Sequence, residues 1–227
     1  MTKDTVFPEK GIKAYRSSFL DFLDDPFYSP EADCVRFIQD GLLVLDNGKI
    51  REIGDYEQLK DRYLDIPIVS YPGMLIMPGF IDTHIHYPQT EMIAAYGEQL
   101  LEWLTKYTFP TEGKFKDKDY AKKVAAFFLN ELLKNGTTTA LVFAAVYPQS
   151  ADAFFEEAYS RNLCMIAGKV MMDRNAPDFL LDTPESSYTE TKELIEKWHK
   201  KGRLRYAVTP RFSITSSNCL LYTSDAA

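Results

Sequence analysis

The stretch "PGFIDTHIHYPQ", Pro78–Gln89, closes an apolar run with two histidines that are one residue apart. The chain has three histidines in all, so His84 and His86 bring two of them to one place. Side chains at positions i and i+2 of a strand point to the same face, and the two imidazoles are therefore expected to project together. Two neutral imidazoles can bind one zinc ion, but a catalytic zinc needs a third protein ligand and an open position. The stretch predicts part of a metal site, and a pair of satisfied core histidines is the alternative.

Three other polar residues bear on this prediction. Asp82 has the same strand parity as the histidines, so its carboxylate is a candidate to orient an imidazole, and the alternative is that it caps a turn or faces a neighbouring strand. His199 lies in "EKWHKKG", at a charged helix end where a solvated imidazolium is favourable, and is expected at the surface rather than in a metal site. Lys169, in "AGKV", is interpreted as a strand-end lysine. The alternative is a carboxylated lysine that bridges two metals, as in some metal hydrolases.

After Tyr71 the sequence alternates between segments typical of strands and segments typical of helices. Strands are expected over 74–86, 137–146, 163–172 and 204–212, and helices over 118–136, 150–162 and 184–202. The glycines Gly136 and Gly202 follow two of the helices and are expected at their ends. Alternation of this kind predicts βα units and a parallel sheet. The predicted fold class is α/β, an incomplete (β/α)8 TIM barrel with about the first four βα units, whose active site lies at the C-terminal ends of the strands.

The first 70 or so residues have a different pattern, with short apolar runs between turn residues. In "CVRFIQDGLLVLDNGKIREIG", both Asp40-Gly41 and Asn47-Gly48 are hairpin signals. A brief helix is expected over 55–64, and another short strand in "IPIVSYPG". These features predict a small β domain before the barrel.

Composition limits the class of protein. The chain has 227 residues, of which 45% are hydrophobic, and a formal net charge of −7 with both signs mixed along it. The acidic balance argues against nucleic acid as a partner. The N-terminal residues lack the order of a signal peptide, and no apolar run approaches the length of a membrane span. The three cysteines, Cys34, Cys164 and Cys219, form no CxxC pair. We therefore expect a cytoplasmic protein that does not bind a membrane.

The last nine residues, "CLLYTSDAA", differ from the rest. They resemble a sequencing-library transposon adapter translated in frame. We expect residues 219–227 to be non-biological, and an ordinary disordered tail is the alternative.

The string "MPGFIDTHIH" resembles the first barrel strand of the amidohydrolase superfamily. Four further strings, "LLEWLTKYTFPTE", "LKNGTTTA", "GKVMMDRNAPD" and "VTPRFSITSS", narrow the resemblance to the guanine deaminase family. The resemblance runs from about Ala14 to Asn218. It implies a homodimeric enzyme with one zinc ion per subunit that converts guanine and water to xanthine and ammonia in purine catabolism. It also implies a composite β-sandwich, to which residues 1–72 belong, and a barrel whose first half is residues 73–218.

The resemblance assigns roles to five residues. His84 and His86 correspond to zinc ligands, while Gln89, Arg211 and Phe212 correspond to residues that line the guanine pocket. An arginine offers fixed donors to the guanine carbonyl, and a phenylalanine offers a flat face to the ring.

The remaining parts of the family's site are a third histidine followed by an acid/base glutamate, another histidine and an aspartate. After Arg211 the sequence has no histidine, and its only acid is Asp225. We therefore expect a truncated N-terminal portion of such an enzyme, with no catalytic acid/base residue of its own. The alternatives are another deaminase or hydrolase of the same superfamily, and an inactive fragment.

Overall fold

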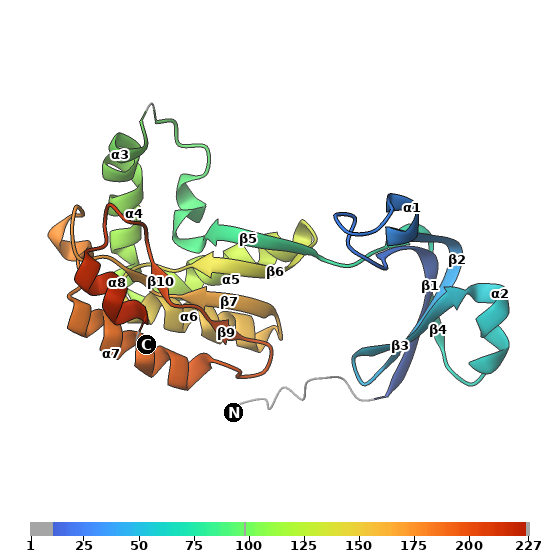
Figure 1. Cartoon of the computed structure of the whole chain (residues 1–227). Coiled ribbons are helices and arrows are strands. Elements are labelled where there is room, and N and C mark those ends of the chain that lie inside the picture. The colour runs from blue at the N-terminus through green and yellow to red at the C-terminus, as the bar shows by residue number, and fades with distance from the viewer. Residues whose placement is uncertain (1–10, 98, 226–227) are drawn as a thin grey trace. The chain divides into compact units, whose positions relative to one another are not determined.

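The computed structural model describes residues 11–97 and 99–225, so the first ten of the N-terminal residues on which the signal-peptide prediction rests lie outside the described part. The chain divides into two compact units between Pro78 and Gly79 (Figure 1). No helix in the described residues is long and apolar enough to cross a membrane.

The first unit is built around a four-stranded sheet with the order β3-β2-β1-β4. Its elements are β1 (Ile12–Phe22), α1 (Glu31–Cys34), β2 (Val35–Asp46), β3 (Lys49–Asp55), α2 (Tyr56–Leu59), the 3-10 helix η1 (Lys60–Arg62) and β4 (Ile68–Ile76). Strands β1, β2 and β3 pair antiparallel, and β4 joins β1 in parallel. The short helix α2 covers the sheet, and Leu59 and Tyr63 complete a small apolar core with Ala14, Leu42 and Val44.

The two hairpin predictions had different outcomes. Asn47 and Gly48 both have positive φ and connect β2 to β3, so the hairpin predicted there is confirmed. The hairpin predicted at Asp40-Gly41 is wrong, because both residues lie inside β2. Gly41 lies instead at an irregularity of the β1–β2 pairing, where a Cβ would come within 2.6 Å of the Phe19 ring. This glycine serves close packing and not a turn.

The second unit carries the alternating elements. They are β5 (Phe80–His86), the 3-10 helix η2 (Tyr87–Met92), α3 (Leu100–Trp103), the π-helix η3 (Leu104–Thr108), α4 (Phe109–Gly113), η4 (Lys114–Lys116), α5 (Lys118–Lys134), β6 (Thr137–Phe143), α6 (Pro148–Ser160), β7 (Cys164–Gly168), β8 (Val170–Met171), η5 (Asp178–Leu180), α7 (Pro184–Trp198), β9 (Arg205–Tyr206), β10 (Thr209–Pro210) and α8 (Asn218–Asp225).

Strands β5, β6, β7 and β9 form one parallel sheet in that order, as Figure 1 shows, and a separate parallel pair joins β8 to β10. Helices α5, α6 and α7 follow the first three strands, so the predicted βα alternation is confirmed. Gly136 has a φ of +82° just after α5, as expected for a helix end. The helices pack their apolar faces on the strands, and the shared core contains Phe128, Phe154 and Trp198.

Three predicted strands are interrupted. The strand expected over 74–86 is split, because Met77-Pro78-Gly79 separates β4, in the first unit, from β5 in the second. Proline has no N–H to continue a ladder, which gives the break a local cause. The strand over 163–172 breaks at Lys169, and the strand over 204–212 breaks between Tyr206 and Thr209. At both of these breaks the chain leaves the four-stranded sheet and forms the β8–β10 pair.

The final segment forms the helix α8, in which Leu220 is fully buried. This differs from a disordered tail. The origin of residues 219–227 stays a prediction, as do the domain limits at residues 72 and 218.

Candidate functional site

The two predicted metal ligands lie together at the C-terminal end of β5. The ring centroids of His84 and His86 are 5.2 Å apart. The Phe143 ring, at the end of β6, lies 4.8 Å from the His84 ring and 4.4 Å from the His86 ring, centroid to centroid. The position of this phenylalanine follows from register, since His86 pairs with Phe143 across the sheet. The imidazoles therefore project together, as the strand spacing predicted.

The chemistry of His86 fits a metal ligand. Its Nδ1 atom is buried and has no hydrogen-bond partner within the described structure. Burial, with the nearby Arg211 and His84, lowers the pKa of His86 to about 3. The ring is therefore neutral at physiological pH, which is the form that binds zinc. A buried nitrogen of His86 without a partner and a second imidazole beside it are what two ligands of an incomplete site need.

Asp82 lies inside β5, and its side chain contacts the backbone of the same strand. Its Oδ1 accepts the backbone N–H of His84 at 3.0 Å. The contact fixes the backbone at the first histidine, and a role in orienting an imidazole stays a prediction.

A cavity of about 350 Å³ opens beside the histidines. It is lined by His84, Ile85, His86, Gln89, Thr90, Met92, Ile93, Ala94, Ala95, Trp103 and Phe128. The predicted purine-binding residue Gln89 thus shares one cavity with both predicted zinc ligands. Arg211 and Phe212 are not among the lining residues. Phe212 packs instead against the neighbouring apolar cluster around Phe109 and Val170.

Arg211 is connected to the cavity through a residue that sequence reasoning missed. Glu112, on α4, is fully buried, and its carboxylate receives Arg211 Nη1 at 2.5 Å and Nη2 at 3.0 Å. The same carboxylate accepts Gln89 Nε2 at 3.3 Å. We call Gln89, Glu112 and Arg211 the pocket network. It joins two of the three predicted purine-binding residues, Gln89 and Arg211, through contacts that span 23 and 99 positions of sequence.

Two loops hold Arg211 in place. Its backbone N–H donates to the Met171 carbonyl at 3.1 Å, which continues the β8–β10 pairing. Beyond it, Asp173 and Ser217 are joined by a backbone-to-carboxylate hydrogen bond of 2.8 Å and by a second bond between their side chains. The Asp173 N–H also donates to the Thr215 carbonyl. The loops "MDRN" and "RFSITSS" therefore form one unit that fixes the arginine.

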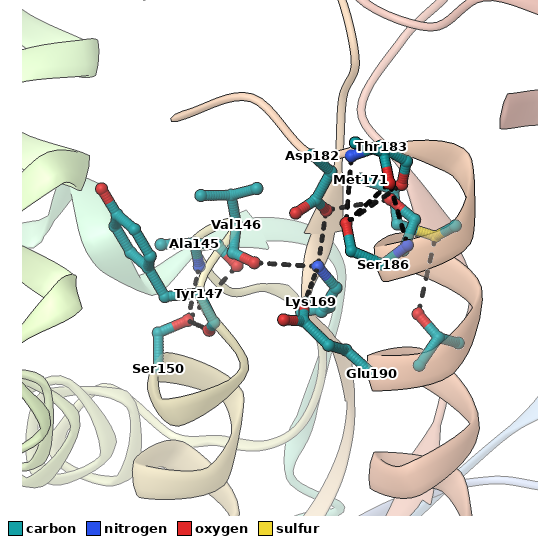
Figure 2. A network of polar contacts seen from close by, with 12 residues as sticks. Ala145, Val146, Tyr147, Ser150, Lys169, Met171, Asp182, Thr183, Ser186 and Glu190 are labelled. Carbon is teal, nitrogen blue, oxygen red and sulfur yellow. Dashed lines mark hydrogen bonds and ion pairs between the residues drawn. The ribbon is translucent and has the colours of Figure 1, made fainter. Parts of the chain in front are cut away.

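Lys169 belongs to a second, separate network (Figure 2). Its side chain is fully buried, and Nζ lies 3.0 Å from the Val146 carbonyl, 2.5 Å from Asp182 Oδ2 and 2.7 Å from Glu190 Oε2. An ammonium group has three N–H donors, and three acceptors surround this one. The expected strand-end role describes it well, whereas a carboxylated lysine would place a negative charge beside two carboxylates. We call Lys169, Asp182 and Glu190 the strand-end network.

The third histidine lies apart from the site, as expected. His199 is exposed at the end of α7, where its Nδ1 accepts the Tyr206 N–H at 3.2 Å. Across the described residues, no group of three or more His, Cys, Asp or Glu side chains is arranged to hold a metal. The described chain brings together two candidate ligands, a cavity and the pocket network.

Comparison with known proteins gives this arrangement a context. Residues 75–224 match the model of the Amidohydrolase family. The guanine deaminase of Escherichia coli (strain K12) is 59% identical over 213 residues, which cover 92% of this chain and 48% of that protein.

Solved structures agree with the sequence comparison. The E. coli guanine deaminase structure matches with a TM-score of 0.90 at 57% identity, covering 94% of this chain and 50% of that one. The guanine deaminase from C. acetobutylicum with bound guanine matches with a TM-score of 0.85 at 31% identity, covering 95% and 50%. The chain spans about half the length of the curated relatives it matches.

Proposed function

Since the chain belongs to the Amidohydrolase family, we propose that it carries the first zinc ligands and the purine-binding residues of a guanine deaminase. The reaction is the conversion of guanine and water to xanthine and ammonia. The observation that carries the proposal is the single cavity shared by His84, His86 and Gln89, with Arg211 joined to Gln89 through Glu112. The close relatives named guanine deaminase support it.

The two histidines are proposed to hold the zinc ion, one per subunit. A zinc ion bound in such a site supplies the Lewis acidity that activates water at neutral pH. Within this chain, Phe143 packs against both imidazoles and keeps them in place. Burial keeps His86 neutral and ready to bind the metal. The further ligands and the acid/base group are proposed to come from residues outside these 227.

The proposed part of Gln89, Arg211 and Phe212 is recognition of the purine. Gln89 and Arg211 offer hydrogen bonds of opposite sense, and Phe212 offers an aromatic face. A site built to hydrogen-bond a particular base rejects bases that leave its polar groups unpaired.

The fold is proposed to be the first half of a (β/α)8 barrel. Four parallel strands lie in sequence order, helices follow the first three, and the histidines lie at a C-terminal strand end, where barrel active sites are found. The sheet of β1–β4 is proposed to be part of a β-sandwich. A homodimer is proposed from the family resemblance, and a cytoplasmic location is proposed from the composition. Size-exclusion chromatography with light scattering tests the dimer.

A substrate comparison tests the proposed function. The protein expressed from its complete gene is loaded with zinc, and ammonia release is followed with guanine, adenine and cytosine. We expect release from guanine, with a kcat/KM at least about a thousandfold above the other two. A preference for adenine or cytosine would place the chain with a different deaminase of the family.

A further inference from the structure

Within the part of the chain that the structure describes, Glu112 contacts both polar residues of the proposed purine pocket. It lies on α4, while Gln89 comes from η2 and Arg211 from the segment after β10. The Glu112 side chain has no exposed surface, and that of Arg211 is 4% exposed. A buried charge pair of this kind has a fixed geometry, because neither group can turn toward water.

The carboxylate decides which end of the Gln89 amide faces it. A carboxylate only accepts hydrogen bonds, whereas the glutamine amide has a donating NH2 end and an accepting carbonyl end. Gln89 therefore presents Nε2 to Glu112, at 3.3 Å. The carbonyl oxygen is on the other side of the amide, and Gln89 lines the cavity. This orientation makes Gln89 an acceptor toward a ligand.

The same carboxylate orients the arginine. Glu112 takes one N–H from each of Nη1 and Nη2, which leaves three of the five guanidinium donors for other partners. The guanidinium carbon also lies 5.7 Å from the centre of the Phe109 ring. Held from two sides, Arg211 can only act as a donor in a fixed direction.

We infer that Glu112 is a positioning residue that sets the hydrogen-bond polarity of the pocket, with Gln89 as acceptor and Arg211 as donor. The inference rests on the proposed function and names the chemical class of its ligand. That class is a purine whose edge carries a carbonyl acceptor beside a ring N–H donor, as guanine has at O6 and N1. Adenine has the reverse order, an amine donor beside a ring nitrogen acceptor. Glu112 thus selects 6-oxopurines over 6-aminopurines without touching either.

Binding to the metal-free protein tests the inference, since guanine is then not converted during the titration. Dissociation constants for guanine and adenine are measured by calorimetry on the protein expressed from its complete gene, for wild type and E112Q. The glutamine variant can offer an NH2 group to Gln89 and so permits its amide to reverse. We expect guanine affinity to fall about tenfold or more and adenine affinity to change by less than about twofold.

The matched control is E91Q. Glu91 lies two residues from Gln89 and has the same chemistry, but it pairs with Lys114 and Tyr120. This variant should keep the guanine preference of the wild type. A loss in E91Q equal to that in E112Q would mean that general charge, and not positioning, governs affinity, and would overturn the inference.

A double-mutant cycle separates positioning from a purely structural role. Q89M removes the amide and leaves the Glu112–Arg211 pair intact, so it should lose the guanine preference by itself. If Glu112 acts through Gln89, the double variant E112Q/Q89M loses less than the product of the two single losses. A loss equal to the product means independent action and contradicts the inference.

Folding is checked by thermal unfolding, because E112Q leaves a buried arginine without its carboxylate. If E112Q does not fold, E112D replaces it, since the shorter side chain keeps the charge but cannot span both partners. A guanine preference kept within about twofold in the folded variant overturns the inference. A wild type that shows no guanine preference contradicts the proposed function itself, and the inference with it.

Discussion

The pocket network and the strand-end network use the same groups in different ways. Both bury a cation against carboxylates, and they flank the β8–β10 pair, Lys169 just before β8 and Arg211 just after β10. Lys169 Nζ donates hydrogen bonds to the Val146 carbonyl and to Asp182, and it forms an ion pair with Glu190 at 2.7 Å. Glu112 takes only two of the five donors of Arg211. The two networks therefore differ in their relation to the cavity: the pocket network includes Gln89, which lines it, whereas no residue of the strand-end network does.

The largest expected effect is a loss of stability when the strand-end network is broken. K169M leaves the partly buried carboxylates of Asp182 and Glu190 beside each other without their cation, and we expect a loss of about 3–5 kcal/mol in the free energy of unfolding. Urea unfolding followed by circular dichroism measures it. The control is K192M, an exposed lysine on the same helix as Glu190, which should change stability by less than about 0.5 kcal/mol. A loss below about 1 kcal/mol in K169M would show that this network is not a brace.

The second largest expected effect is on zinc affinity, at the histidines beside the pocket network. H86N removes a proposed ligand whose Nδ1 is buried and unpaired, so zinc affinity should fall about a hundredfold or more. Competition with a chromophoric chelator gives the constant. H199N changes the exposed histidine and should leave zinc affinity unchanged. Equal zinc affinities for H86N and the wild type would remove His86 from the site.

A smaller change in stability is expected when Glu112 and Arg211, the ion pair of the pocket network, are replaced together. The double variant E112M/R211M fills the space with apolar side chains and leaves no unpaired charge. It should unfold within about 1 kcal/mol of the wild type while losing guanine binding. E112M alone or R211M alone should lower the free energy of unfolding by more than the double variant does, because each leaves one buried charge unpaired. A double variant that still binds guanine would show that the pocket network has no role in recognition.

The smallest expected effect is a pH dependence of the stability that the strand-end network contributes. Burial raises the pKa of Asp182 above its ordinary value of 3.8, although Lys169 opposes the shift. The folded state then holds a proton that the unfolded state has lost, so this residue's contribution to stability falls as pH rises above 3.8 through the folded pKa. D182N should flatten that slope, with a change of about 1 kcal/mol or less. Thermal unfolding across this pH range, in both proteins, checks the prediction. An unchanged slope would assign the dependence to other groups.

The sequence predicted the elements that depend on local pattern. Spacing and turn chemistry were enough to predict the histidine pair, helices α5 to α7, the Asn47-Gly48 hairpin and the exposed position of His199. The Asp40-Gly41 pair led to a wrong hairpin prediction. Its glycine is needed for close packing against the Phe19 ring on the paired strand, and such a contact leaves no local signal in the sequence.

Glu112 could not be predicted for a related reason. It is one acid among many in the sequence, and its partners lie 23 and 99 positions away. Its one local signal is that phenylalanines, Phe109 and Phe115, lie three residues to either side, and this becomes informative only when the fold buries them. The split of the strand at Met77-Pro78-Gly79 also needed the fold, although Pro78 offered a local hint.

The most direct test of the account is the zinc dependence of xanthine formation from guanine. The protein expressed from its complete gene is assayed by absorbance as isolated, after treatment with a chelator, and after zinc is returned. We predict that chelation abolishes xanthine formation, that zinc restores it in the wild type, and that zinc does not restore it in the H84N/H86N variant. Xanthine formation that persists in the chelated protein or in that variant would contradict the account.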